Sequence, residues 1–317
     1  MNLHKGSTHL LSAVRNAILL MPEFAVGTIA FTLLALNTIF CALMLFPMAG
    51  VKFLMPTPGG KKKVSAVLNE LGLGWIARNN AILALTKRIN WQVTGIENLD
   101  PMGWYLVISN HQTWVDILVL QKVFHRKIPF LKFFLKKELI WVPIMGPAWW
   151  ALEFPFMKRY SKEFIRKNPH LEGKDTQITI KACERFKDIP ISVMNFVEGT
   201  RFTKGKHDRQ KSPFKHLLKP KAGGISFVLY AMGKYLDRIA DVTIVYPAGP
   251  PTFWEFLCAR ECDVRVHVRM VPVTPEIIGD YAKDPAFRES FQEWLNTLWT
   301  EKDLLIETFF NKMRKAA

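Results

Sequence analysis

An uncharged apolar segment near the N-terminus, from Phe24 to Val51, constrains this chain more than any other feature. About 20 apolar residues suffice to cross a bilayer as a helix, whereas the apolar region of a signal peptide spans only about 7 to 15 residues. Core helices of soluble proteins rarely run so far without a charge. The segment therefore predicts a membrane-embedded helix, and Pro47 within it leaves a bent or re-entrant insertion as the alternative.

The charges that flank this segment predict its orientation. Lys52 and the run Lys61–Lys63 follow it, against Lys5 and Arg15 before it. Because cytoplasmic flanks carry the excess of lysine and arginine, the downstream side is expected to face the cytoplasm, at the inner membrane if the cell is bacterial. These lysines would also rest against anionic lipid.

Downstream of the anchor, two kinds of apolar pattern alternate. Strand patterns occupy Trp91–Glu97, Tyr105–Ser109, Phe154–Met157, Ile191–Val197, Val242–Tyr246 and Val264–Met270. Helical patterns occupy Val64–Leu85, Trp114–Phe124, Asp175–Phe186, Ile225–Leu236 and about Ala286–Met313. The alternation predicts an α/β fold with a mixed, mainly parallel sheet flanked by helices. We expect a membrane anchor over residues 1–60 and an α/β domain over residues 61–317 that includes the C-terminal helix. Strict alternation in Val264–Met270 predicts an edge strand.

Composition narrows the classes of partner. The chain has 43 basic and 27 acidic residues, a net charge of +16, so anionic partners are expected: nucleic acid, anionic lipid head groups or phosphorylated small molecules. The 4 cysteines form no CxxC pair, which predicts reduced thiols in a cytosol-facing domain. No histidine pair at zinc spacing accompanies Cys258 and Cys262, so no metal site is expected.

A histidine and an aspartate lie five residues apart in the stretch SNHQTWVDIL, which begins at Ser109. One interpretation is structural: Thr113 and Asp116 fit a helix-capping pattern, and His111 is then an ordinary loop residue. The other is catalytic. On one continuous helix these positions would point about 140° apart, so a pair forms only if His111 precedes the helix and Asp116 lies in its first turn. The carboxylate could then fix the imidazole tautomer and raise its basicity.

A second motif, Glu198-Gly199-Thr200-Arg201, follows another predicted strand. The glycine permits close backbone approach, and the arginine suits a bidentate anion. The structural alternative is an ordinary turn at Glu-Gly-Thr followed by a solvated arginine. The basic segment 204–221 comes next and ends in Lys221, directly before a predicted helix N-terminus, which is a natural phosphate site. A solvated charge run is the structural alternative.

In this order and spacing the motifs resemble the glycerophospholipid acyltransferases, most of all the lysophosphatidic acid acyltransferases and their lysocardiolipin-acylating relatives. The resemblance covers about Trp91 to Pro247. Its four blocks correspond to Asn110–Asp116, Phe156–Arg159, Glu198–Arg201 and Tyr246-Pro247. Two departures bear on the choice of acceptor: Met157-Lys158 replaces the usual Ile-Asp, and Pro220 interrupts the usual doubled lysine.

The resemblance implies transfer of a fatty acyl group from a thioester to the hydroxyl of a lysophospholipid already in the membrane. His111 would be the general base and Asp116 its orienting partner. The resemblance implies that Arg159, Arg201 and Lys221 hold the acceptor phosphate. It implies that Glu198 shapes the pocket, that Gly199 leaves room for substrate, and that Thr200 also belongs to the substrate-binding site. Acyl-CoA or acyl carrier protein would serve as co-substrate, and no cofactor is expected. No covalent acyl-enzyme is needed, which agrees with the lack of a G-x-S-x-G motif.

Two other interpretations remain open at this level. One is a transacylase that moves chains between lipids on the same fold without a thioester. The other is a non-catalytic, membrane-tethered protein that binds anionic ligands through its positive charge. Because no nucleic-acid-binding motif appears in the sequence, nucleic acid is not an expected partner.

Overall fold

The structure, a computed structural model, describes residues 12–157 and 190–316 and divides the chain into two compact units. Unit 1 comprises the described residues up to Gln92 together with Thr113–His125 and Tyr246–Arg265. Unit 2 comprises Val93–Gln112, Val266–Ala316 and the described residues between Arg126 and Val245. The division into an anchor over 1–60 and an α/β domain over 61–317 stays a prediction.

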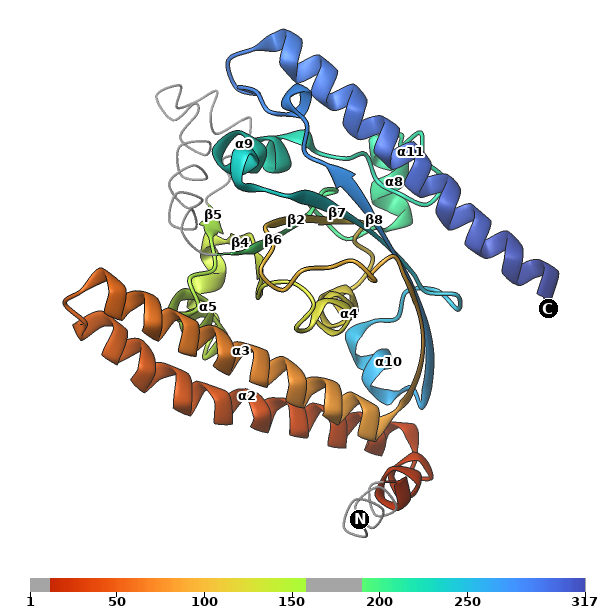
Figure 1. The fold of residues 1–317 in the computed structure, drawn as a ribbon. Coiled ribbons are helices and arrows are strands. Elements are labelled where there is room, and N and C mark those ends of the chain that lie inside the picture. The colour runs from red at the N-terminus through yellow and green to blue at the C-terminus, as the bar shows by residue number, and fades with distance from the viewer. Residues whose placement is uncertain (1–11, 158–189, 317) are drawn as a thin grey trace. The chain divides into compact units, whose positions relative to one another are not determined.

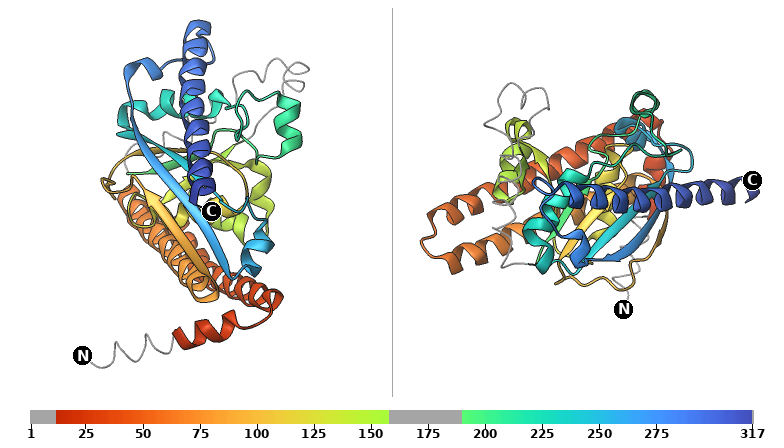
Figure 2. Two further views of the ribbon diagram at one scale, coloured as in Figure 1. Left: turned by 90° about the vertical axis from the view of Figure 1, so that its right-hand side faces the viewer. Right: turned by 90° about the horizontal axis from the view of Figure 1, so that it is seen from above.

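Two long helices dominate unit 1 and run side by side, α2 (Glu23–Leu54) and α3 (Pro58–Thr86) (Figures 1 and 2). The predicted apolar segment lies wholly within α2, and among the described residues this is the helix long and apolar enough to cross a membrane. The helix continues through Pro47. Helix α3 begins where the Thr57 side chain accepts a hydrogen bond from Gly60 N.

A buried polar cluster joins α2 to α3. Asn37, 7% exposed in the middle of the apolar helix, donates its amide hydrogens to Asn79 Oδ1 at 2.7 Å and to the Trp75 carbonyl at 3.1 Å. Arg78 Nε donates to Asn37 Oδ1 at 2.7 Å. Because an unpaired amide in an apolar contact is costly, these bonds fix how the two helices lie along each other.

Two short helices complete unit 1. Helix α4 (Val115–Phe124) packs on α3, and α10 (Phe253–Cys258) packs on α2. The contact with α10 is close at Gly27, where an added Cβ would lie 2.4 Å from Cys258 Sγ. A capping box, in which Thr252 and Glu255 exchange hydrogen bonds, begins α10.

The main sheet has six strands in the order β1-β8-β7-β2-β6-β3. Their bounds are β1 Arg88–Thr94, β2 Tyr105–Ser109, β3 Leu131–Phe133, β6 Ser192–Phe196, β7 Arg238–Val245 and β8 Glu261–Pro272. Strand β2 pairs in parallel with both β6 and β7, and β3 pairs in parallel with β6. All five residues of β2 are buried, as a central parallel strand requires. The predicted α/β architecture is confirmed.

One prediction about the sheet is wrong: β8 is not at the edge. Strand β1 lies outside it, with hydrogen bonds from Arg88 N to the Arg260 carbonyl and between the side chains of Asn90 and Asp263. The alternation in β8 shows that one face is more exposed than the other. It carries no information about a neighbour, because a paired strand with one open face alternates in the same way.

Unit 2 has its core between the sheet and two helices, α9 (Ala222–Met232) and α11 (Pro285–Ala316) (Figure 1). Both helices contribute to one cluster of buried apolar residues, which includes Leu106 from β2, Val228 from α9 and Trp299 from α11. The remaining elements are β4 (Leu135–Lys136), which pairs in parallel with β5 (Phe156–Met157), the helices α5 (Met145–Ala151) and α8 (Lys204–Gln210), and the 3-10 turns η1 (Lys137–Trp141), η3 (Gly233–Tyr235) and η4 (Pro275–Ile277). The helix predicted over Asp175–Phe186 lies outside the described residues.

Removing the Asn37 amide from the buried polar cluster should weaken the packing of α2 against α3. Asn37→Ala leaves Asn79 and Arg78 without their shared partner, so the free energy of unfolding is expected to fall by about 1–3 kcal/mol. Chemical unfolding in detergent measures the change. Asn80→Ala is the matched control, because it removes an amide from α3 without touching Asn37, and equal losses in both variants would contradict the role given to Asn37.

Candidate active site

A two-way hydrogen bond holds the chain directly after β2. Asn110, 1% exposed, donates its side-chain amide to the Ile244 carbonyl at 2.9 Å and accepts from Ile244 N at 2.9 Å. Gln112 Nε2 donates to the same carbonyl at 2.7 Å. His111 therefore lies between two side chains that are both fixed to β7, at the carboxyl end of the central strand. Clefts in α/β sheets form at this end of the strands.

Residues of the second motif region orient the backbone and ring of His111. The imidazole stacks on the Phe196 ring, with centroids 3.8 Å apart and an interplanar angle of 12°. His111 N donates to Glu198 Oε1 at 3.3 Å, and Phe202 N donates to the His111 carbonyl at 2.7 Å. The structure thus brings His111 and Glu198 together, although 86 residues separate them in the sequence.

Glu198 is fully buried, and both of its oxygens accept backbone hydrogen bonds. Oε1 accepts from His111 N and Oε2 from Leu218 N at 3.2 Å. A buried carboxylate is costly unless such donors satisfy it. The glutamate therefore ties the turn after β2 to the segment that leads into α9.

The rest of the second motif forms a tight turn after β6. Gly199 has φ +68°, a conformation that glycine adopts without strain, and its N–H donates to the Phe196 carbonyl at 2.9 Å. Lys206 Nζ donates to Thr200 Oγ1 at 2.8 Å and to the Arg201 carbonyl at 3.0 Å. The turn leaves Arg201 exposed.

Lys221 lies beside this turn, since its N–H donates to the Val197 carbonyl at 2.9 Å. It is the N-cap residue of α9. Gly224, in the first turn of α9, has a packing reason: an added Cβ would lie 2.6 Å from Asn195 Nδ2. The small residue lets the first turn of α9 approach the end of β6.

Asp116 lies in the first turn of α4 and is fully buried. Its Oδ2 accepts from Thr113 N at 3.0 Å, and its Oδ1 accepts from Tyr246 Oη at 2.7 Å. Burial and the Asp116 charge raise the pKa of the Tyr246 phenol well above its usual value. Sequence analysis placed Tyr246 in a motif but did not identify this hydrogen bond. The pairing of Asp116 with His111 stays a prediction.

The predicted cap of α4 needs a correction. The N-cap residue is Trp114, whose side chain makes no capping hydrogen bond. The Thr113 hydroxyl instead donates to the Pro251 carbonyl at 2.5 Å. Asp116 still accepts from Thr113 N, so half of a capping box is present. A sequence pattern shows where a cap can form, but it does not show that a carbonyl remote in the sequence takes the hydroxyl.

The basic segment 204–221 is held in place by two acidic residues of α11. Asp303 accepts the backbone N–H groups of Lys215 at 2.8 Å and His216 at 2.7 Å. Glu307 pairs with Lys215 Nζ at 2.8 Å and His216 Nε2 at 2.6 Å, and these partners lower the pKa of its carboxyl to about 2. These contacts hold residues 215 and 216 in place, while most lysine side chains of the segment remain exposed.

The structure does not place every predicted site residue. Arg159 lies outside the described residues. Within the described ranges, no group of three or more histidine, cysteine or acidic side chains could hold a metal ion.

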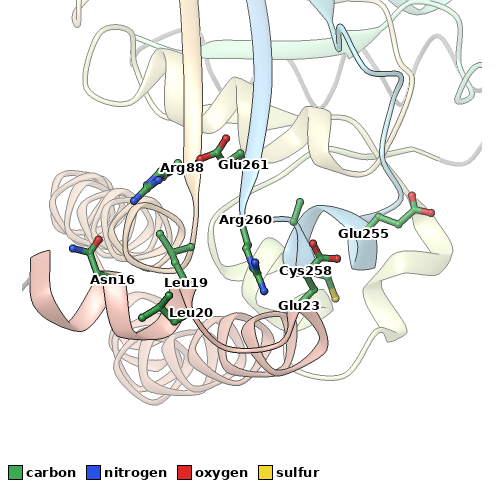
Figure 3. Close-up of a pocket in the computed structure, with 10 residues that line it drawn as sticks. Asn16, Leu19, Leu20, Glu23, Arg88, Glu255, Cys258, Arg260 and Glu261 are labelled. Carbon is green, nitrogen blue, oxygen red and sulfur yellow. Dashed lines mark hydrogen bonds and ion pairs between the residues drawn. The ribbon is translucent and has the colours of Figure 1, made fainter.

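A cavity of about 840 Å³ in unit 1 contains none of the predicted site residues (Figure 3). Its charged lining has internal partners: Arg88 pairs with Glu261 at 3.3 Å, and Arg260 donates to the Met21 carbonyl at 2.9 Å. No sequence pattern indicated this cavity, because its lining comes from segments remote along the chain.

Comparison with known proteins identifies the family. A family model described as Acyltransferase matches residues 90–247, which contain all the motifs described above. This chain belongs to the acyltransferase family. Two relatives illustrate the breadth of its similarities. The 1-acyl-sn-glycerol-3-phosphate acyltransferase gamma of Mus musculus is 28% identical over 65% of this chain, and lysocardiolipin acyltransferase 1 of Mus musculus is 24% identical over 77%.

Coverage and fold add to this assignment. The match spans 54% of the first acyltransferase and 64% of the second, so this chain spans little more than half the length of these relatives. Among acyltransferases of known structure, the 1-acyl-sn-glycerophosphate acyltransferase PlsC from Thermotoga maritima aligns with a TM-score of 0.50 and 17% identity, over 89% of this chain and 98% of that chain. This likeness confirms the fold.

Removing the Tyr246 hydroxyl should expose how strongly Asp116 depends on it. Tyr246→Phe deletes a hydrogen bond to a buried carboxylate, so the free energy of unfolding is expected to fall by about 1.5–3 kcal/mol. The matched control is Tyr105→Phe, which deletes a bond that the oxygen of a buried phenol accepts from the Asp100 N–H and should cost about 0.5–1.5 kcal/mol. Urea unfolding compares the two, and an equal or smaller loss for Tyr246→Phe would refute the ranking.

Proposed function

We propose that this protein transfers a fatty acyl chain from an acyl thioester to the free hydroxyl of lysophosphatidic acid or a related lysophospholipid. The product is phosphatidic acid or a diacyl phospholipid. The observation that carries the proposal is His111, fixed at the carboxyl end of β2 by its neighbours and by Glu198. It lies in a chain of the acyltransferase family, whose named relatives act on such lipids.

In the proposed reaction His111 is the general base. One nitrogen of its imidazole takes the proton of the acceptor hydroxyl, and the oxygen attacks the thioester carbonyl. A carbon–oxygen bond forms, the carbon–sulfur bond breaks, and the departing thiolate takes the proton back from the imidazolium. Asp116 orients the ring and favours the charged imidazolium that forms. The Phe196 stack restricts the ring to one plane, which reduces the freedom that the transition state must remove.

Basic side chains hold the acceptor phosphate in this proposal. Arg201 is exposed beside the Glu198 turn, and Lys221 is tied to the same turn through Val197. Arg159 is the third proposed contact. Each charge-assisted hydrogen bond contributes about 1.5–3 kcal/mol. Glu198 is a poor candidate for proton transfer, because both of its oxygens already accept backbone hydrogens, and Thr200, which accepts from Lys206, helps to shape the pocket. Gly199 leaves space for the substrate.

The apolar helix α2 gives the proposed reaction its location. A lysophospholipid resides in the bilayer, so a membrane-embedded anchor brings the enzyme to its acceptor. We further propose that the catalytic residues lie on the cytoplasmic side, where acyl-CoA and acyl carrier protein are found. The basic residues after α2 support this orientation.

Loss of the imidazole should abolish transfer without unfolding the protein. His111→Ala is expected to lower kcat by about 100- to 10,000-fold, the usual contribution of a general base. Purified protein in detergent, supplied with labelled oleoyl-CoA and lysophosphatidic acid, tests this by the yield of phosphatidic acid. His267→Ala, in strand β8, is the control and should keep wild-type activity. Near-normal turnover by His111→Ala would defeat the general-base role, and product formed without a thioester would indicate a transacylase.

Loss of the exposed guanidinium should weaken acceptor binding. Arg201→Ala is expected to raise KM for lysophosphatidic acid by about 10- to 100-fold, as removal of one charge-assisted contact predicts, while KM for the thioester changes little. Arg238→Ala, an exposed arginine at the start of β7, is the matched control. Equal effects on both substrates would count against a phosphate contact. If the protein is a non-catalytic binder, neither the wild type nor Arg201→Ala forms product, and Arg201→Ala retains less lipid.

A further inference from the structure

A lysine of helix α11 is buried completely within unit 2. The Lys302 side chain is 0% exposed, and its Nζ lies 2.6 Å from Asp241 Oδ1. The same ammonium donates to the Val242 carbonyl and to Thr243 Oγ1. The three partners are consecutive residues of β7, so one ammonium group binds three successive positions of the strand.

The need of Asp241 for a positively charged partner does not explain why Lys302 is buried here. Asp241 Oδ2 already pairs with Arg269 at 2.8 Å, and Arg269 also pairs with Glu301. Burying an ammonium costs several kcal/mol, and well-packed apolar residues often stabilise a core equally well. Desolvation accordingly lowers the pKa of Lys302, although Asp241 acts to raise it. A charge kept in the core at this cost suggests a use beyond packing.

The contacts of Lys302 with β7 lie next to the residues that position His111, and this location indicates the use. The residue after Thr243 is Ile244, whose N–H and carbonyl bind the amide of Asn110 and whose carbonyl also binds Gln112. These are the two neighbours of His111. In the sheet register Asp241 and Val242 lie opposite Ile108 and Ser109, the last two residues of β2. The charge of Lys302 also interacts with that of Glu198, which accepts from His111 N.

We propose that Lys302 is a positioning residue for His111. It fixes the β7 backbone that binds both neighbours of the histidine, and it places a positive charge near the glutamate that holds the histidine N–H. The proposal rests on the proposed function insofar as His111 acts as base. Lys302 touches neither substrate nor reacting atoms, so its effect passes through Ile244 and Glu198.

The test compares two cations that share one carboxylate. Lys302→Met removes the contacts of the ammonium group with β7. Arg269→Met removes the other partner of Asp241 and leaves the Lys302 contacts in place. Thioester-dependent acylation of lysophosphatidic acid is measured over pH for both. Lys302→Met is expected to lower kcat by about 10-fold or more with KM within about twofold, while Arg269→Met keeps kcat within about twofold. Equal losses in both variants, or a wild-type kcat in Lys302→Met, would overturn the proposal.

A second variant separates positioning from folding. Asp241→Asn/Lys302→Met replaces the buried ion pair by neutral groups and leaves no uncompensated carboxylate, so it should fold, as a thermal unfolding transition verifies. Its kcat should remain low. Recovery of kcat in this double variant would show that Lys302→Met acted only by leaving Asp241 without its lysine, and would refute the role.

A readout on His111 itself is independent of turnover. The rate of its modification by diethylpyrocarbonate at one fixed pH, followed by mass spectrometry, reports how the imidazole is held. Lys302→Met and the double variant release the β7 backbone that binds both neighbours of His111, so each should change this rate by about twofold or more, whereas Arg269→Met should not. An unchanged rate in Lys302→Met would contradict the proposal. A changed rate in a protein with no acylation at all would refute the proposed function while leaving the positioning role in place.

Discussion

The two-way hydrogen bond between Asn110 and Ile244 is the constraint on which the site depends. A parallel ladder ends where one strand leaves the sheet, and the next residues would ordinarily be free to move. Here the side-chain amide of Asn110 continues the pairing with β7 for one more residue. Gln112 does the same from the other side of His111. The histidine thus occupies a loop position, but it is held nearly as firmly as a strand residue, as its proposed role as general base requires.

Several buried charges lie around this constraint. Glu198 and the pair formed by Asp241 and Lys302 are all buried in unit 2. Each contacts the backbone of the segments around His111: the glutamate through the His111 and Leu218 N–H groups, the lysine through the Val242 carbonyl. Apolar residues would fill the same volume at lower cost. The buried charged groups have an advantage over apolar residues because their hydrogen bonds are directional. A directional hydrogen bond fixes a backbone in a way that an isotropic apolar contact cannot.

Sequence analysis predicted the features that depend on local pattern. The apolar helix, the central strand Tyr105–Ser109 and the alternation of strands with helices all follow from periodicity, and the structure confirms them. The positions of His111 before α4 and Asp116 in its first turn follow from the spacing in the same way. The motifs also indicated the family, because they recur in a fixed order.

Features that depend on contacts between remote segments could not be predicted. Alternation in β8 could not show that β1 covers its edge. Nothing near Thr113 indicated that its hydroxyl would bond to Pro251, and nothing near Tyr246 indicated that its phenol would donate to Asp116. Lys302 resembled any lysine on an amphipathic helix. In each case the partner lies more than about 50 residues away, and only the folded chain brings the two together.

The amide cluster between α2 and α3 bears on how the chain is made. An asparagine in the middle of an apolar helix would enter hydrocarbon with its polar groups unsatisfied, at a cost of several kcal/mol. Asn79 and Arg78 remove that cost only when the second helix is already alongside. We expect the two helices to insert as a pair: an embedded α2 would gain stability once α3 has been synthesised and has closed against it.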